Sequence, residues 1–489
     1  MKGDSRNPVP VTRLCGMLAL CGLSGAVSAE EPVLLNDRSG GQIVIQAETE
    51  LSIEGFSGTV AVRAGKSGEL RYEIRALADR NQPRALALWS TKGVLRLVPI
   101  EPPATEPLLV EIAVPPALAV NVDLSDSKVE VSGLNSPVGV TGARLELDIR
   151  GIAGTVDLAV SEATVRIDGI AGDVSFEGES VRLDLRRVQG SAGLTVQGGE
   201  VTLAEVSGET DADLGETVFN AVALVHGARV QAAGGRISLG QVSQQVELVV
   251  EGTPVEISGA SGRVTVDSDS EVTLNEVQGT VILTGYGGVI RGTASSGPLE
   301  ITIDDADVTL EQWQGKIDVR GDGLDLAMRQ ITGSIAAATT SSNFVIERVE
   351  GPVTIENEFG DVRVSGVSGT TKIVNRDGIT VAADLNGQLD LHGSGERVEV
   401  SWAQLGSDAN HVIENAAGQV VLRVPTNARC RFDVRSEFGE VNSQLPGVQV
   451  SDDGTFASGA LGGAEQPTIQ VRSSGDVELS QYSPPAPTQ

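Results

Sequence analysis

From Lys128 onward the chain repeats one pattern of hydrophobic and polar positions. Aliphatic residues stand at offsets 0, 2, 5, 9 and 11 of each copy, and a glycine stands at offset 7. The clearest copy covers residues 165–176, and the copy at 147–158 is displaced from it by 18 residues at every position. Copies begin at residues 129, 147, 165, 183, 201, 219, 237 and 255, near 272 and 289, and at 308, 326, 344, 362, 380 and 398.

The spacing within a copy predicts strands. Aliphatic residues two apart lie on the same face of a strand, whereas a helix would need spacings of three and four. Each copy therefore predicts two short strands, and the glycine between them, as at Gly190 and Gly315, is expected to form a sharp bend with positive φ. One such unit cannot bury its apolar face alone, so the copies must stack on one another.

The stacked copies predict an all-β fold, a single-stranded parallel β-helix (β-solenoid) with about 18 residues per turn. We expect a right-handed coil, because the apolar offsets do not repeat every six residues as in a left-handed helix of three six-residue sides. Sixteen turns with strands about 4.8 Å apart give a rod on the order of 75 Å long. The degraded copies near Phe219 and Val289, the first with His226 in place of glycine, predict bulges or local loops.

The sequence outside the repeat divides the remaining chain. An isolated copy of the pattern at residues 51–62 lies in a β-rich but irregular region, and atypical end segments are expected to cover the exposed strand edges of a solenoid. The predicted segments are a signal peptide at 1–29, an irregular N-terminal region and cap at 30–124, solenoid repeats at 125–405, C-terminal turns and cap at 406–482, and a disordered tail at 483–489.

The N-terminal residues predict export. Basic residues precede an apolar run from Leu14 to Val27, and Ala29 ends a small-residue cleavage pattern. The apolar run is shorter than the roughly 18 residues that span a bilayer, so we expect cleavage before Glu30 and no transmembrane segment afterwards. Lipidation at Cys21 is the weaker alternative, because Leu20 before it is not small. The predicted location is the periplasm, the outer membrane surface or the extracellular space.

Charge and composition exclude several classes of partner. The formal charge of −30 becomes −32 without the signal, which carries Lys2, Asp4, Arg6 and Arg13. A chain this acidic repels nucleic acid and anionic lipid, so we expect neither as a partner. Aromatic residues make up only 3%, which predicts a narrow aliphatic core. Cys430 has no partner in the mature chain and is expected to be a buried small residue.

Several segments resemble the closing parts of a known family. They are Glu111–Ala117, Val424–Ala428, Phe432–Val441 and Val471–Leu479. These stretches look like those of the bacterial putative-adhesin family, a group of exported β-helix proteins of uncharacterised function. The resemblance implies a β-helix and an envelope or surface location, and it brings no catalytic residues to this chain.

The chain contains few residues that suggest chemistry. Gly-x-Ser-x-Gly, Walker-type, His-Glu-x-x-His and Cys-x-x-Cys motifs are absent, and His226, His392 and His411 are interpreted as surface or turn residues. We therefore predict no catalytic residues and no cofactor. Two acidic clusters are weak candidates for calcium, although solvated turns explain them better; they are Asp267, Asp269 and Glu271, and Asp304, Asp305 and Asp307.

The leading functional hypothesis is a non-enzymatic exported envelope or surface protein, an adhesin or scaffold that presents extended faces to an envelope or extracellular protein or glycan. The alternative is a carboxylate-dependent enzyme acting on polysaccharide, although its expected aromatic platforms are not evident, since Trp89, Trp313 and Trp402 are far apart in sequence. An accessory module of an envelope-stress or signalling system is a third possibility. An outward column of Glu130, Asp148, Arg166 and Asp184 predicts ion-pair ladders along the rod.

Overall fold

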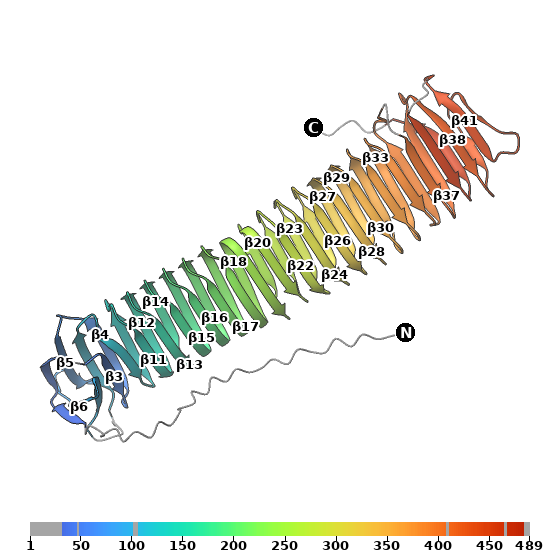
Figure 1. Cartoon of the computed structure of the whole chain (residues 1–489). Helices are drawn as coiled ribbons and strands as arrows, with labels where there is room; N and C mark the ends of the chain where they lie inside the picture. Colours follow the sequence, from blue (N-terminus) through green and yellow to red (C-terminus); the bar gives the residue numbers. More distant parts are fainter. Residues whose placement is uncertain (1–31, 46–47, 101–105, 407–409, 464–466, 484–489) are drawn as a thin grey trace, which may run out of the picture.

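The chain coils into one narrow rod made of strands (Figure 1). Every regular element of the described residues is a strand, and 43 strands join in one continuous sheet, which confirms the predicted all-β solenoid. The computed structural model describes residues 32–45, 48–100, 106–406, 410–463 and 467–483. The predicted signal peptide lies outside these residues, as does all but the first residue of the predicted tail.

The regular coil begins at β10 and continues to β35, with two strand segments in each turn. The bounds are β10 (Ser127–Ser132), β11 (Val138–Ala143), β12 (Leu145–Ile152), β13 (Val156–Ser161), β14 (Thr164–Ile170), β15 (Val174–Val188), β16 (Ala192–Val206), β17 (Thr210–Leu224), β18 (Ala228–Glu251), β19 (Val255–Ser258), β20 (Ser261–Ser268), β21 (Val272–Asn275), β22 (Val281–Tyr286), β23 (Val289–Thr293), β24 (Leu299–Asp304), β25 (Asp307–Glu311), β26 (Ile317–Asp322), β27 (Asp325–Thr332), β28 (Ile335–Thr340), β29 (Asn343–Glu350), β30 (Val353–Asn357), β31 (Val362–Val367), β32 (Thr371–Asn375), β33 (Ile379–Leu385), β34 (Leu389–Gly393) and β35 (Arg397–Trp402).

Parallel pairing follows the sequence repeat. β12 pairs with β14 and places Leu147 beside Val165, a register of 18 residues. The lost residue of register falls between β19 and β21, where Val255 pairs with Val272. The next pair joins Val272 to Ile290, so the predicted start near 289 is wrong by one residue. Ile290 is buried and Val289 is not, because a shift of one residue turns a side chain to the other face.

The copy at Phe219 forms no loop. Phe219 pairs with Val201 on one side and Ile237 on the other, both 18 residues away, and its side chain is fully buried. The predicted irregularity is therefore wrong for this copy. The bulky ring occupies a column that elsewhere holds Val, Ile or Leu, so the core accepts one large residue without a change of register.

The glycine column has a different role from the predicted one. Gly172, Gly190 and Gly208 do not have positive φ, although Gly315 does. A Cβ on Gly190 would lie 2.4 Å from the carbonyl oxygen of Gly172, so close approach of successive turns excludes a side chain there. The left-handed corners lie in two other columns, which hold many residue types; examples are Asp126, Arg144, Glu162, Ser180 and Glu216 in one, and Arg187, Glu205, Ala223 and Gln241 in the other.

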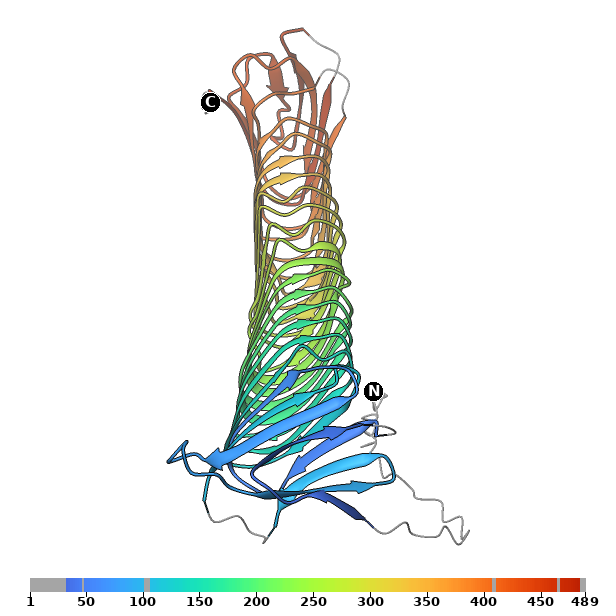
Figure 2. The same cartoon turned by 90° about the vertical axis from the view of Figure 1, so that its left-hand side faces the viewer.

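The N-terminal end is closed by a turn that is out of chain order. Residues 50–64 form a true solenoid turn, in which β3 pairs with β7 and β9, and β4 pairs with β8 and β10. Antiparallel strands cover the outside, where β5 pairs with β8 and β6 with β7 (Figure 2). The bounds are β1 (Val33–Asn36), β2 (Gly40–Val44), β3 (Glu50–Glu54), β4 (Gly58–Ala64), β5 (Glu69–Ala76), β6 (Leu86–Thr91), β7 (Val94–Pro99), β8 (Leu108–Val114) and β9 (Ala119–Asp123).

The C-terminal end repeats this arrangement in reverse. The chain leaves β37, forms the outer turn of β38 and β39, and returns to insert β42 between β36 and β38. β43 likewise lies between β37 and β39, and β41 covers β38 in the antiparallel sense. The bounds are β36 (His411–Asn415), β37 (Gln419–Pro425), β38 (Cys430–Ser436), β39 (Val441–Ser443), β40 (Val448–Val450), β41 (Phe456–Leu461), β42 (Thr468–Ser473) and β43 (Val477–Tyr482).

Candidate functional site

Two long faces of the rod differ in the balance of their charges. We call the paired face the outward residues of β10, β12, β14, β19, β21, β23, β25 and β27, together with those of segments 181–186, 199–204, 217–222 and 235–240. We call the acidic face the outward residues of β13, β20, β22, β24 and β26, together with those of segments 174–179, 192–197, 210–215, 228–233 and 246–251. Asp269, which follows β20 at the edge, is included in the acidic face.

Ion pairs join successive turns on the paired face. Lys128 lies 2.8 Å from Glu146, and Arg182 lies 2.7 Å from Glu200. The predicted outward column is confirmed by the strand register, and within it Arg166 lies 3.7 Å from Asp184. Exposed pairs of this kind contribute about 0.2–1 kcal/mol each. The carboxylates of this face are thus largely matched by arginine and lysine.

Carboxylates on the acidic face far outnumber basic residues. Arg229 contacts Glu247 at 3.2 Å, and Arg320 contacts Asp318 at 3.0 Å, while no other basic side chain belongs to the face as defined. Its carboxylates are Asp157, Glu177, Glu179, Asp211, Asp213, Glu247, Glu251, Asp267, Asp269, Glu300, Asp304, Asp318 and Asp322. Glu177, Glu179, Asp213, Glu251 and Asp267 are exposed and form no ion pair with any described residue.

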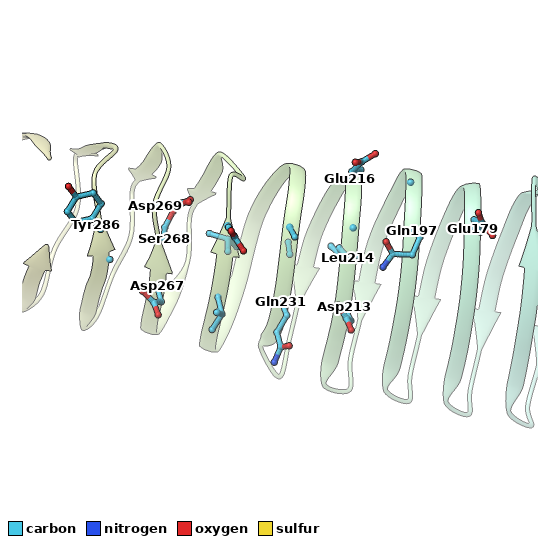
Figure 3. A pocket seen from close by; sticks show the side chains of 18 of the residues that line it. Glu179, Gln197, Asp213, Leu214, Glu216, Gln231, Asp267, Ser268, Asp269 and Tyr286 are labelled. Carbon is cyan, nitrogen blue, oxygen red and sulfur yellow. The ribbon is translucent and has the colours of Figure 1, made fainter. Parts of the chain in front are cut away.

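A groove of about 1240 Å³ runs along the acidic face from β15 to β22 (Figure 3). Gly215 and Ala233 stand in its middle, between the longer side chains of Gln197 and Glu251 in the same column. Small residues in two successive turns therefore hollow the surface. The charged lining residues are all acidic; they are Glu179, Asp213, Glu216, Glu251, Asp267 and Asp269.

The first calcium candidate is not gathered into one site. Asp267 points outward on the acidic face. The Asp269 carboxylate accepts hydrogen bonds from the Gly252 amide at 2.7 Å and the Ser270 hydroxyl at 3.0 Å, which lower its pKa. Glu271 forms an ion pair with Arg291 on the paired face. The corner of the coil thus sends the three carboxylates in different directions.

The second calcium candidate is divided by the same corner. The Asp304 carboxylate accepts a hydrogen bond from the Asp322 amide at 2.9 Å, and Asp305 occupies the left-handed corner. Asp307 begins β25 on the paired face. Across the described parts of the chain, no three His, Cys, Asp or Glu side chains are placed to hold a metal ion.

The histidines have three different environments. His226 and His392 are surface residues, the latter between Asp390 at 3.0 Å and Glu414 at 2.9 Å. His411 is fully buried against Trp402, so its interpretation as a surface or turn residue is wrong. Burial lowers the pKa of His411 to about 4. Cys430 is buried as predicted, and burial raises its pKa to about 12, which keeps the thiol protonated.

The aromatic residues on the surface are not the tryptophans. Trp313 and Trp402 are fully buried, whereas Tyr286, Phe359 and Phe438 are 62%, 47% and 81% exposed. Tyr286 lies at one end of the groove. Sequence reasoning missed these three residues, and the only local signal is the glycine that follows each of them at a corner of the coil.

Comparison with known proteins supports the fold. No curated protein matches the chain. A solved structure described as a "putative cell adhesion protein" from Clostridium sporogenes ATCC 15579 is 7% identical, covers 91% of this chain and 100% of its own, and has a TM-score of 0.13. No helix among the described residues is long and apolar enough to cross a membrane. Residues 299–480 match the Toastrack DUF4097 family, which confirms the resemblance to an adhesin-like β-helix family of uncharacterised function.

Proposed function

We propose that this protein is a non-enzymatic, exported envelope or surface protein that acts as an adhesin or scaffold. The observation that carries the proposal is the acidic face, where a row of exposed carboxylates has no basic partners while the neighbouring face is matched. A rigid solenoid holds this face open over many turns. Such a surface suits the binding of an extended partner more than the enclosure of a small substrate.

The polysaccharide-active alternative is favoured by one observation, the presence of Asp213, Asp267 and Tyr286 along a single groove. Paired carboxylates are the usual catalysts of glycoside hydrolysis. Turnover of a glycan panel by the mature protein, abolished by Asp213→Asn or Asp267→Asn, would favour this activity over a scaffold.

The proposed function is tested in the bacterium that produces the protein. We expect antibodies to label the protein on intact cells, and we expect deletion of its gene to reduce attachment to surfaces or to other cells. Complementation with the wild-type chain should restore attachment. A protein that is labelled only after the outer membrane is permeabilised, with unchanged attachment of the deletion strain, would contradict the proposal.

A further inference from the structure

We infer that the groove of the acidic face binds an extended, lysine- and arginine-rich segment of a partner protein, lying parallel to the axis of the rod. This inference rests on the proposed adhesive or scaffolding function and names the chemistry of the partner. Three properties of the groove carry it, namely its charge, its length and its exposed apolar atoms.

The charge of the groove calls for a cationic partner. All its charged lining residues are acidic, and Asp213, Glu251 and Asp267 are exposed without ion pairs. Like charges held on a rigid sheet repel one another, and a ligand with positive charges relieves that repulsion. The paired face has the same strands and the same spacing, yet its carboxylates are neutralised within the chain.

The length of the groove suits a polymer more than a small ion. Its lining includes one residue from each of seven successive turns; they are Glu179, Gln197, Gly215, Ala233, Glu251, Asp269 and Tyr286. Six steps of about 4.8 Å give a length of about 29 Å, which accommodates about nine residues of extended polypeptide. The hollow at Gly215 and Ala233 leaves room for a backbone between Gln197 and Glu251.

Exposed apolar atoms in the groove favour a side chain with an aliphatic stem. Val249 is 49% exposed, and the Tyr286 ring is 62% exposed at the end of the groove. Lysine and arginine pack their methylene groups on apolar surface while their charged ends reach carboxylates. The Tyr286 ring can also contact a cation through its π face. A bare metal ion would use neither feature.

The test measures binding of a fluorescein-labelled decapeptide of alternating Lys and Ser to the mature protein by fluorescence anisotropy. A Gln–Ser decapeptide, Ca²⁺ and a panel of neutral oligosaccharides serve as comparison ligands. We expect the triple variant Asp213→Asn, Glu251→Gln, Asp267→Asn to raise the Kd for the Lys–Ser peptide at least tenfold. Binding should weaken as salt is raised from 20 to 200 mM, because the contact is electrostatic.

The matched control is the triple variant Glu256→Gln, Asp307→Asn, Glu311→Gln, which makes the same change in net charge on the paired face. These residues are also exposed and without ion pairs, so the control should change the Kd less than twofold. Equal weakening by both variants, no binding of the peptide, or binding of an oligosaccharide or Ca²⁺ in its place would overturn the inference. Attachment that is lost on gene deletion but retained by the groove variant would leave the proposed function standing and the inference refuted.

Discussion

At the scale of single residues, an interior column near the C-terminus contains a ladder of asparagines with one gap. The Asn357 side chain accepts a hydrogen bond from Thr339 at 3.0 Å and donates one to Asn375 at 3.2 Å. Gly393 occupies the next turn, and the buried side-chain oxygen of Asn415 beyond it has no hydrogen-bond partner. A buried polar atom without a partner costs free energy, so the gap weakens this part of the rod.

Filling the gap should stabilise the protein. Gly393 does not have positive φ, and a Cβ there would come no closer than 3.3 Å to another atom, that of Asn415. We expect Gly393→Asn to raise the free energy of unfolding by about 0.5–1.5 kcal/mol relative to Gly393→Ala, through a hydrogen bond to Asn415. Urea unfolding of the two variants measures the difference. A Gly393→Asn protein no more stable than Gly393→Ala would contradict this account of the ladder.

The buried His411 makes stability depend on pH. Its pKa is about 4 in the folded chain and near 6.5 when unfolded, so the unfolded state binds the proton more tightly. This contribution is full above pH 6.5 and is lost as pH falls toward 4, by about 3 kcal/mol in total. His411→Leu suits a column that holds Leu389 on one side and Ile469 on the other. Urea titrations should lose this difference in the variant; the same pH slope in both proteins would refute the assignment.

At the scale of elements, the spacing of apolar residues predicts the strands and their register, but not the corners. Strand positions follow from an alternation that any β-solenoid must satisfy. The left-handed corners, by contrast, hold residues as different as Arg187, Glu205 and Ala223, so residue type alone does not reveal them. For the same reason the acidic face could not be recognised from the sequence. The corners decide which outward columns share a face, and so they divide Asp267 from Glu271.

The close approach of turns at the glycine column yields a matched pair of substitutions. We expect Gly190→Ala to lower the free energy of unfolding by about 1–3 kcal/mol, because its Cβ would overlap the carbonyl oxygen of Gly172. Gly193→Ala, three residues later, meets no atom closer than 4.0 Å and should be neutral or slightly stabilising. Thermal unfolding followed by circular dichroism compares them. Equal effects would show that the glycines are not there for close packing of turns.

At the scale of the whole molecule, both ends are locked by turns inserted out of chain order. The sequence predicts that residues 467–482 stack on a neighbouring turn, since their alternation is regular. It does not say which turn, because aliphatic strands such as β37 and β39 offer the same surface to β43. The region 299–480 that matches the Toastrack family includes this inserted C-terminal turn.

Removal of the inserted turn should loosen one end only. Without residues 467–489, the strand edges of β36 and β38 that β42 now joins would be unpaired. We expect hydrogen exchange of the amides in β36–β41 to become fast in this variant, while those in β12–β31 remain protected, because each turn of a solenoid depends on its neighbours. Loss of protection throughout the rod would instead indicate that the ends nucleate the whole fold.

The central claim is that all repeats stack into one straight rod, which alone gives the acidic face its length. Small-angle X-ray scattering of the mature protein tests this directly. The sixteen regular turns and the turns at both ends predict a longest dimension of about 100 Å and a radius of gyration near 30 Å, from a rise of about 4.8 Å per turn. A longest dimension near 60 Å with a radius of gyration of about 23 Å, as for a compact chain of this length, would contradict the account.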